Sequence, residues 1–324
     1  MNVAIIGAGS IAAKMAETLR GMKVAGEDVE LYAIASRDPE KADAFARGEG
    51  FRKAYGSYEK MLKDDGVDLV YVATPHSHHY EHMKLCIGYG RPILCEKSFT
   101  GNARQAEEIL NLAEQKRIPL TEAIWTRYQP ARKIMDDVIA SGKIGEVKLV
   151  TSSLCYGIRN VPRIREPALA GGALLDLGVY VLNFASMILG PDIQRRESSV
   201  QLLESGTDAQ ETMTLFYPNG AMANLMASVM AFGNRDCYVM GTEGWITTDN
   251  VNNPVHIVLH KDGKEEILPV PEQITGYEYE VRACQRMLAE GKLECEEMPH
   301  AETLRIMKLM DSFRADWGVR YPFD

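Results

Sequence analysis

The stretch Asn2-Val3-Ala4-Ile5-Ile6-Gly7-Ala8-Gly9-Ser10-Ile11-Ala12 decides the predicted fold, because an apolar run of strand length opens there into a glycine-rich turn. Gly7, Gly9 and Ala12 have the G-x-G-x-x-A spacing of the dinucleotide-binding fingerprint. Gly7 permits a tight strand-to-helix turn, Gly9 lets the backbone approach a pyrophosphate, and Ala12 keeps the helix close to the strand. The first amides of that helix, at Ser10 and Ile11, then point at the phosphates. Glycine-rich turns also serve plain α/β packing, so the flanking strand and helix are part of the signal.

A second predicted strand, Glu30–Ala35, ends where a dinucleotide-binding protein has its ribose-binding residue. No acidic residue lies at that end. Ser36 and Arg37 follow instead, and a guanidinium binds phosphate through a planar fork. This pattern favours NADP, with NAD as a weaker alternative. The competing interpretation is that Arg37 is a solvated loop residue and that Asp38 caps the next helix.

Length and composition indicate a soluble globular protein of about two domains, since the chain has 324 residues, 46% hydrophobic and 25% charged. We expect no apolar stretch approaching the roughly 20 residues needed to cross a bilayer. The first strand begins almost at Met1, so no secretory signal is expected before it and the predicted location is cytoplasmic.

The spacing of the cysteines and the net charge disfavour several kinds of site and partner. The six cysteines include no C-x-x-C pair, which favours reduced, buried thiols over a disulfide framework or a zinc site. A formal net charge of −9 without a basic run disfavours nucleic acid and anionic membranes as partners.

Strands and helices alternate up to Ile124, a pattern typical of a parallel, doubly wound sheet. From Glu146 onward, strands of alternating polarity dominate, which indicates an antiparallel sheet. The predicted fold is therefore α/β: an N-terminal Rossmann domain over residues 1–122, and a C-terminal α+β domain over 123–324 with a large, mostly antiparallel open sheet. The expected strands are Asp68–Ala73, Pro92–Cys95, Leu120–Ile124, Glu146–Cys155, Glu211–Tyr217, Ala221–Met230, Cys237–Met240 and Val255–Leu259, and the expected helices are Pro39–Arg47, Ser57–Lys63, Tyr80–Tyr89, Ala103–Lys116, Ala173–Ile188, Tyr277–Ala289 and Ala301–Trp317.

Two further strand ends carry polar residues, and ligands of open parallel sheets bind at the carboxyl ends of strands. The first end reads Ala73-Thr74-Pro75-His76-Ser77-His78-His79, with His82 soon after. These histidines lack evident acid or thiol partners in matching geometry, so we expect no metal site. The second end reads Leu94-Cys95-Glu96-Lys97-Ser98, which places Lys97 on the side expected for a nicotinamide. The alternative for Lys97 is a lysine on a surface loop.

A polar stripe lies in the apolar segment from Gly171 to Asn183. Asp176, Tyr180 and Asn183 fall at i, i+4 and i+7, so on a helix they share one face. Polar groups placed in this way need partners or a ligand. The alternative for Tyr180 is a core tyrosine whose hydroxyl is satisfied within the fold.

Together these motifs resemble the Gfo/Idh/MocA oxidoreductase family, and within it the branch of dimeric dihydrodiol dehydrogenases and NADP-dependent D-xylose dehydrogenases. The resemblance runs from the first strand to Trp317-Gly318-Val319-Arg320-Tyr321-Pro322. It is carried by Gly7-Ala8-Gly9, Ala73-Thr74-Pro75, Cys95-Glu96-Lys97, Glu122-Ala123-Ile124-Trp125-Thr126-Arg127 and Gly171 to Tyr180.

The resemblance implies hydride transfer to or from NADP, a C-terminal open sheet that supports dimers, and Lys97 and Tyr180 as the catalytic pair with Asp176 beside them. Many family members have histidine where this chain has Tyr180, whereas the dihydrodiol branch has tyrosine. Ser98 departs from the proline that usually follows the Glu-Lys pair. His79 matches a position that is commonly histidine in the family.

The motifs and the resemblance together define the predicted site. The cofactor-binding set comprises Gly7, Gly9, Ser10, Ile11, Ala12, Ser36, Arg37, Thr74, Pro75, His76, His79, Glu96, Lys97, Trp125 and Arg127. The substrate set comprises Trp125, Tyr156, Arg159, Arg163, Asp176 and Tyr180, although Arg159, Arg163 and Arg165 also fit a solvated loop. No metal is expected.

The predicted function is NADP-dependent hydride transfer involving a secondary alcohol or carbonyl of a sugar, cyclic diol or dicarbonyl, by a homodimer or higher homo-oligomer. An NADP-binding sensor without catalysis and a partner-binding protein on an old enzyme fold are the alternatives. The presence of both Lys97 and Tyr180 disfavours a sensor without catalysis. A partner-binding protein would not need the phosphate site at Arg37, which disfavours that alternative too.

Overall fold

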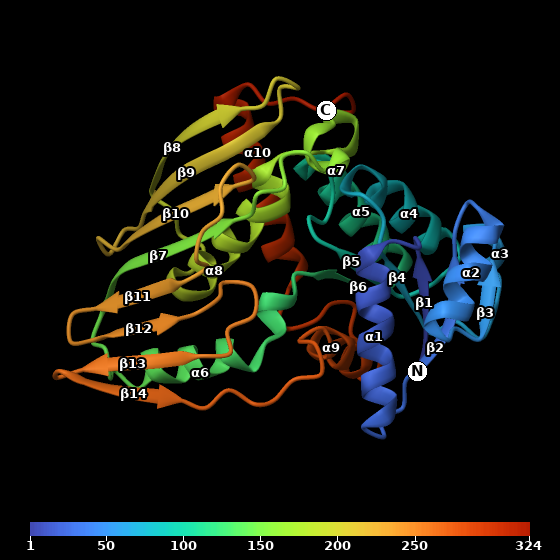
Figure 1. Ribbon diagram of the computed structural model, residues 1–324, viewed down its shortest axis with the longest axis horizontal. Helices are drawn as coiled ribbons and strands as arrows, with labels where there is room; N and C mark the ends of the chain where they lie inside the picture. The colour runs from blue at the N-terminus through green and yellow to red at the C-terminus, as the bar shows by residue number, and fades with distance from the viewer. The chain divides into compact units, whose positions relative to one another are not determined.

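The computed structural model describes residues 1–324, which form two compact units (Figure 1). Unit 1 comprises Met1–Ile124 and Gln273–Met307. Unit 2 comprises Trp125–Glu272 and Lys308–Asp324. The sequence predicted a single change of domain after residue 122. In the structure the chain returns to unit 1 at Gln273, where the backbone N–H of Leu120 donates to the carbonyl of Leu293 at 2.9 Å.

Unit 1 is built on a six-stranded sheet in the order β3-β2-β1-β4-β5-β6, and every pair in it is parallel. Its central strands are almost completely buried, as expected for a parallel sheet covered on both faces. The order reverses at β1, which makes the carboxyl ends of β1 and β4 the topological switch point. The strands are β1 (Asn2–Ile6), β2 (Glu30–Ala35), β3 (Lys53–Tyr55), β4 (Leu69–Val72), β5 (Ile93–Glu96) and β6 (Leu120–Ala123).

The helices of unit 1 form two groups: α1 contacts α2 and α9, and α4 contacts α5. Local capping explains two of their starts. The Asp38 carboxylate accepts from the amides of Glu40 and Lys41, as one alternative predicted, and Asn102 caps α5. The helices are α1 (Ser10–Val24), α2 (Pro39–Glu49), α3 (Tyr58–Leu62), α4 (His76–Gly88), α5 (Ala103–Lys116), α9 (Glu278–Ala289) and the start of α10 (His300–Trp317).

Unit 2 is built on an eight-stranded sheet in the order β14-β13-β12-β11-β7-β10-β9-β8. All its pairs are antiparallel except β7 with β10, which is parallel. The predicted fold class, a Rossmann-type parallel sheet plus a mostly antiparallel sheet, is confirmed. The strands are β7 (Val147–Cys155), β8 (Arg195–Leu202), β9 (Asp208–Phe216), β10 (Met222–Ser228), β11 (Cys237–Gly241), β12 (Trp245–Thr248), β13 (Ile257–Lys261) and β14 (Lys264–Leu268).

Helix α8 (Val179–Leu189) packs on one face of this sheet, against β7 and β10 (Figure 1). The sequence predicted one regular helix from Ala173. In the structure a π-helical turn, η3 (Leu174–Gly178), precedes α8. The other helical segments of unit 2 are η1 (Trp125–Tyr128), α6 (Pro130–Ala140), α7 (Pro162–Arg165), η2 (Pro167–Leu169) and the end of α10.

One helical stretch, Pro167–Leu189, is long and apolar enough to cross a membrane, which the sequence analysis did not anticipate. In its most apolar window, 78% of the residues are buried inside the protein. Core helices of soluble proteins have the same length and composition, so this stretch is weak evidence for a membrane span.

Candidate functional site

The glycine turn after β1 is held at the point where three strands end. The amide of Gly7 donates to the carbonyl of Ala35 at 3.0 Å, and the amide of Ala73 donates to the carbonyl of Ile6 at 2.9 Å. Gly7 has φ +101°, and a Cβ there would lie 2.9 Å from the Ala73 carbonyl oxygen. Only glycine fits this position, both because of its backbone conformation and because β4 approaches so closely.

Gly9, by contrast, faces open space, since a Cβ there would have no atom within 4 Å. It is the N-cap of α1, and no side chain caps that helix. Ser10 is exposed, Ile11 is half-buried and Ala12 is completely buried against the sheet. A 15-residue helix with uncapped N-terminal amides and free space before them fits a dinucleotide pyrophosphate.

The end of β2 carries the predicted phosphate-binding pair. Ser36 is buried, and its hydroxyl accepts from the amide of Asp38 at 3.2 Å. Arg37 is exposed, and its positive charge favours the ionised form of the Tyr58 hydroxyl at the start of α3, although burial raises the pKa of Tyr58 overall. Tyr58 was missed by the sequence analysis, since only the tertiary fold brings α3 to the end of β2.

The ends of β4 and β5 are joined by a buried histidine. His79 Nε2 lies 2.7 Å from the carbonyl oxygen of Thr74, and Nδ1 lies 2.9 Å from that of Ser98. Burial, with the nearby Lys97 charge as a smaller cause, lowers the pKa of His79 to about 4. A neutral imidazole has a single N–H, so His79 donates to only one of these two carbonyl oxygens, and the tautomer decides which. Pro75 is the N-cap of α4, and His76 is its first residue.

Glu96, the last residue of β5, forms its hydrogen bonds within the protein. Glu96 is buried, with Oε1 accepting from the Tyr71 hydroxyl and Oε2 from the backbone N–H of Lys97 at 3.2 Å. Its carboxylate is thus occupied by the protein itself and supports the backbone at Lys97. The peptide bond between Lys97 and Ser98 is cis.

In unit 2 the structure brings together two residues of the predicted substrate set. The Arg163 guanidinium lies 2.6 Å from Asp176 Oδ1, with the Asp176 side chain buried and that of Arg163 half-exposed. Asp176 lies in the π-helical turn η3, and Tyr180 follows in the first turn of α8, where it is also buried. Arg163 is therefore an ion-pair partner of Asp176.

Asn183, the third member of the polar stripe, has a different partner. The Arg127 Nε donates to Asn183 Oδ1 at 2.6 Å, and its NH2 group donates to the Ser186 hydroxyl at 3.1 Å. Arg127 is buried and lies with Trp125 in η1. These contacts join η1 to α8.

The remaining predicted substrate residues lie after β7. The Tyr156 hydroxyl accepts from the Arg235 guanidinium at 3.2 Å. Arg159 is exposed, and its backbone N–H donates to the carbonyl of Val229 at 3.0 Å.

Two buried carboxyl groups on β9 lie beneath the π-helical turn, and neither was predicted. Asp208 Oδ2 accepts from the Leu174 amide at 2.5 Å, and burial raises the pKa of Asp208 to about 6. Glu211 has no hydrogen-bond partner for either oxygen, and a Cβ added to Gly178 would lie 3.0 Å from Glu211 Oε1. Burial, helped by the nearby Asp208 carboxylate, raises the pKa of Glu211 well above its usual value.

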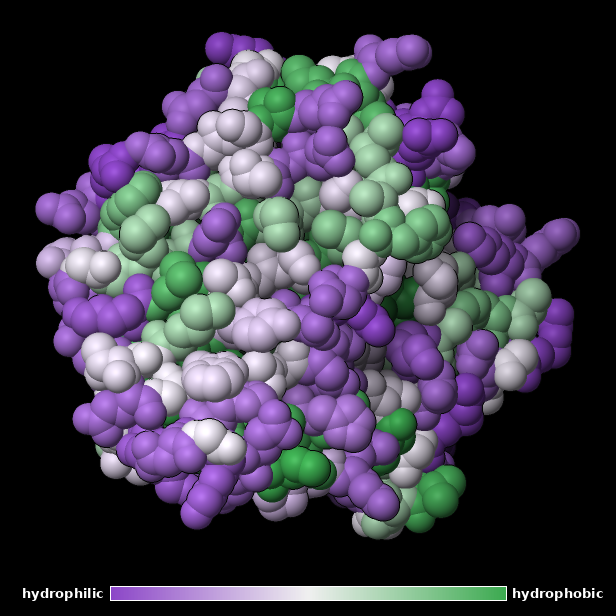
Figure 2. Space-filling view, turned by 60° about the vertical axis from the view of Figure 1, so that its left-hand side comes forward, coloured by the Kyte–Doolittle hydropathy of each residue, from purple (hydrophilic) through white to green (hydrophobic).

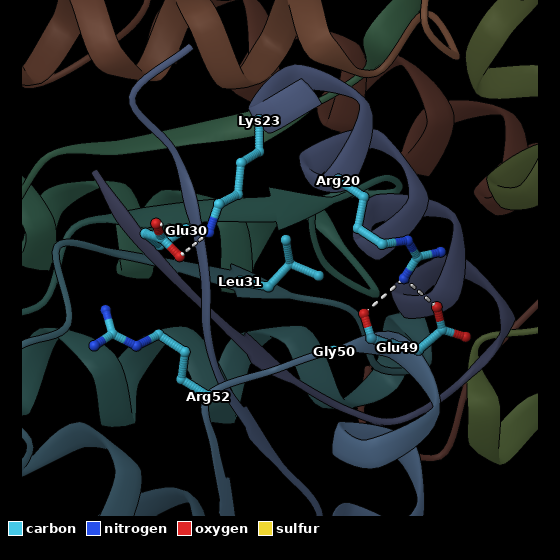
Figure 3. A pocket seen from close by; sticks show the side chains of 7 residues that line it. All are labelled: Arg20, Lys23, Glu30, Leu31, Glu49, Gly50 and Arg52. Atoms are coloured by element: carbon cyan, nitrogen blue, oxygen red, sulfur yellow. Dashed lines mark hydrogen bonds and ion pairs between the residues drawn. The ribbon is translucent and has the colours of Figure 1, made fainter. Parts of the chain in front are cut away.

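Other clusters of charged or coordinating groups have no comparable organisation. No group of three or more His, Cys, Asp or Glu side chains is arranged to hold a metal ion. A hollow on unit 1 is lined by Arg20, Lys23, Glu30, Leu31, Glu49, Gly50 and Arg52 (Figure 3). Its charges compensate one another, with Lys23 bonded to Glu30 at 2.8 Å and Arg20 to Glu49 at 2.6 Å.

Comparison with protein-family models shows two matches along the chain. Residues 1–123 match the model described as "Oxidoreductase family, NAD-binding Rossmann fold", and residues 133–247 match the "GFO/IDH/MocA C-terminal domain". The mouse trans-1,2-dihydrobenzene-1,2-diol dehydrogenase is 31% identical over 99% of this chain and 98% of its own length. The human enzyme of that name is 32% identical over 91% of both chains.

The chain belongs to the Gfo/Idh/MocA oxidoreductase family. The resemblance predicted from the motifs is thereby confirmed, and the family member is an NAD(P)-dependent oxidoreductase that acts on CH–OH groups.

Solved structures of more distant sequence share the fold of this family member. Levoglucosan dehydrogenase in complex with NADH superposes with a TM-score of 0.87 at 18% identity, covering 98% of this chain and 97% of that one. A 3-ketoreductase from Actinomadura kijaniata in complex with NADP and TDP-benzene gives 0.86 at 24% identity, covering 97% of both chains.

The raised pKa of Glu211 makes a prediction about stability. An acid whose pKa is higher in the folded than in the unfolded protein stabilises the fold at low pH, and this contribution is lost as the pH rises. Glu211→Gln should therefore raise the melting temperature at pH 7 and flatten its decline between pH 5 and 7. An increase of about 2–4 °C corresponds to about 1 kcal/mol for a domain of this size. Thermal unfolding across that pH range tests this, and a Glu211→Gln variant that melts earlier than the wild type at pH 7 would contradict it.

Proposed function

We propose that the protein is an NADP-dependent dehydrogenase or reductase that transfers a hydride between the nicotinamide and a secondary alcohol or carbonyl of a sugar, a cyclic diol or a dicarbonyl. The observation that carries the proposal is the 31% identity to the mouse trans-1,2-dihydrobenzene-1,2-diol dehydrogenase along nearly the whole chain. Lys97 and Tyr180, the positions that the family motifs mark as catalytic, are both present.

The geometry of unit 1 supports the cofactor part of this proposal. Gly9 and the uncapped start of α1 suit the pyrophosphate, and Ser36 and Arg37 at the end of β2 suit the 2′-phosphate of NADP. An acidic residue at that end would suit the free ribose of NAD, and none is present there. When bound, the cofactor supplies the hydride acceptor or donor.

The proposed roles of the chain's own residues follow from the proton that accompanies hydride transfer. Tyr180 takes this proton from the alcohol or returns it to the carbonyl. A free phenol has a pKa of about 10, so it accepts a proton poorly at neutral pH. An ammonium group within about 4 to 6 Å favours the phenolate, and we assign that role to Lys97.

Asp176 is proposed to hold a substrate hydroxyl. Its Oδ1 is paired with Arg163, and an ionised carboxylate can accept several hydrogen bonds through its two oxygens. Hydrogen bonds accepted by an ionised carboxylate are stronger than those between neutral groups. Arg163 is therefore assigned to positioning Asp176.

The cofactor proposal predicts that NADP(H) binds more tightly than NAD(H). A charge-assisted phosphate contact is worth about 1.5 to 3 kcal/mol, so the preference should be roughly tenfold to a hundredfold. Titration of both cofactors, followed by fluorescence or calorimetry, measures it. Arg37→Ala should remove most of the preference and leave NAD binding unchanged. Equal affinities in the wild type would refute the assignment.

The catalytic proposal predicts that Tyr180→Phe and Lys97→Met each lower kcat by about 10² to 10⁴, the range for general acid and base catalysis, while NADPH still binds. The double variant should lose little more than the worse single variant, because the two residues act as a unit. A panel of aldoses, cyclic diols, myo-inositol and α-dicarbonyls, followed by NADPH absorbance, first identifies an active substrate. Near-normal turnover by either single variant would exclude this mechanism, and NADP binding without turnover of any substrate would favour a sensor.

The open face of the unit 2 sheet supports a homodimer as part of the proposal. The strand register aligns one row of side chains across β9, β10, β7, β11 and β12: Phe216, Met222, Leu149, Met240 and Trp245. All five are partly accessible, and Trp245 is 44% exposed. Figure 2, turned toward this side of the sheet, shows apolar and intermediate side chains interspersed with polar ones. An apolar row of this length is a surface that association can bury.

Trp245→Glu should therefore yield a monomer, because a carboxylate in place of Trp245, which is 44% exposed at the β12 end of the row, would lose its hydration on association. Light scattering should give twice the chain mass of 36.1 kDa for the wild type and the chain mass for the variant. Val24→Glu, which changes an exposed apolar residue of unit 1 to the same acid, serves as the control and should remain dimeric. A wild type that is monomeric at micromolar concentration would refute the dimer.

A further inference from the structure

A cluster of aromatic side chains surrounds Arg37 in unit 1 and has no role in the site described so far. Tyr58 from α3 meets His82 from α4 edge to face, with ring centroids 4.8 Å apart. His78, one turn earlier on α4, lies with its ring centroid 5.9 Å from that of His82. The positive charge of Arg37 acts on the Tyr58 hydroxyl and on both imidazoles. One arginine and two histidines from two different elements thus converge at the predicted 2′-phosphate position.

Both imidazoles have a lowered pKa in the protein alone. At His82 burial is the largest cause, followed by His78, His79 and then the Arg37 charge, and together they lower the pKa of His82 to about 4. The pKa of His78 is lowered by burial and by Arg37. The other charged group that acts on His82 is the Glu59 carboxylate of α3, which works in the opposite direction as a smaller cause.

The hydrogen bonding of His82 is compatible with either protonation state. Its Nδ1 lies 3.0 Å from the Thr74 hydroxyl oxygen. A hydroxyl donates to a neutral imidazole and accepts from a charged one, so this contact persists when the ring gains a proton. The contact therefore holds the ring in place without fixing its charge.

We infer that His78 and His82 bind the 2′-phosphate of NADP together with Arg37, and that the pair takes up a proton when the phosphate binds. The inference rests on the proposed use of NADP. A phosphate carries a charge of about −1.5 to −2 at pH 7, so beside Arg37 it offsets the repulsion from that residue and adds an attraction for the proton, which opposes the effect of burial on both imidazoles. NAD has a hydroxyl at this position and gives the imidazoles no such partner.

The direction of the pH dependence follows from linkage. If NADP binding takes up a proton, its affinity rises as the pH falls through the range between the imidazole pKa values of the bound and free protein. NAD binding, in which no proton is taken up, should not change. The ratio of the NAD and NADP dissociation constants should therefore increase by roughly three- to tenfold from pH 8.0 to pH 6.5.

Isothermal titration calorimetry at pH 7.0 in two buffers of different ionisation enthalpy counts the protons directly and needs no turnover. The wild type should take up close to one proton on binding NADP and about none on binding NAD. His82→Asn keeps an acceptor or donor for Thr74 without a titratable ring, and His78→Gln removes the second ring. The double variant should lose the proton uptake and most of the pH dependence of the ratio. The 2′-phosphate also titrates, with a pKa of about 6, but at pH 7.0 it is already mostly deprotonated in the free cofactor and can release only a small fraction of a proton, so the difference between wild type and variant is the measured quantity.

The controls distinguish a failure of this inference from a failure of the proposed use of NADP. His256→Gln, which removes an exposed imidazole from unit 2, should behave as the wild type. NAD affinity equal to that of the wild type shows that a variant is folded at the cofactor site. An Arg37-dependent preference for NADP with no proton uptake, or with uptake that survives in the double variant, overturns this inference alone. Absence of any preference for NADP overturns both the inference and the proposed cofactor.

Discussion

The close approach of Gly7 to the carbonyl of Ala73 is the constraint on which the cofactor half of the molecule depends. A Cβ at Gly7 would lie 2.9 Å from that oxygen, so the turn after β1 can pack on the end of β4 only without a side chain. The Gly7 amide in turn donates to Ala35 at the end of β2. Three strands are thus aligned at their carboxyl ends, and the segments that follow them, with Gly9, Arg37 and Thr74, begin from one level of the sheet. The aromatic cluster around Arg37 depends on this alignment, because His82 is held by Thr74.

Unit 2 instead contains buried carboxyl groups that lower its stability locally. Asp208 accepts from the Leu174 amide at the start of the π-helical turn, and the Glu211 carboxyl lies beneath Gly178 without a partner. A buried, unpaired carboxyl group costs free energy whether it is charged or neutral. π-helical turns are rare and occur often at functional sites. This turn carries Asp176 to its ion pair with Arg163, and it immediately precedes the helix that carries Tyr180. Such local costs are expected where a fold positions a site at the expense of stability.

The helices and strands that could be predicted from the sequence are those whose signal lies in adjacent residues. The predicted ranges Glu30–Ala35 and Ala103–Lys116 agree with the bounds of β2 and α5. Both elements depend on neighbouring residues, β2 on a continuous apolar run and α5 on the Asn102 cap just before it. The edge strands β8 and β14 were missed, since nearly all of their side chains are exposed or only half-buried and give little apolar signal in the sequence. Helix α4 begins four residues before its predicted start, because the run of histidines after Pro75 carries no apolar period.

The same distinction applies to the site. Gly7, Gly9, Arg37 and Lys97 could be predicted as site residues because they occupy fixed positions relative to strand ends. Partners that come from elsewhere in the chain were not found: Tyr58 for Arg37, Arg163 for Asp176, and Asn183 for Arg127. Residues 171 to 183 contained a correct signal, a polar stripe in an apolar helix, but its members have separate partners in the structure. The return of Gln273–Met307 to unit 1 is likewise a tertiary pairing that periodicity does not encode.

The choice of histidine beside Arg37 has a physical reason. Two fixed cations about 5 Å apart repel by about 3 kcal/mol at the effective dielectric constant of a protein surface. A lysine in place of His78 or His82 would impose that cost on the protein whenever no phosphate is bound. An imidazole near neutral pH avoids the cost by remaining uncharged, and it gains its charge only when an anion arrives to stabilise it. The Glu59 carboxylate lies close enough to favour protonation of His82, yet burial and Arg37 outweigh it in the protein alone. A bound phosphate acts in the same direction as Glu59 but carries a larger charge, about −1.5 to −2, and so shifts this balance toward the charged imidazole.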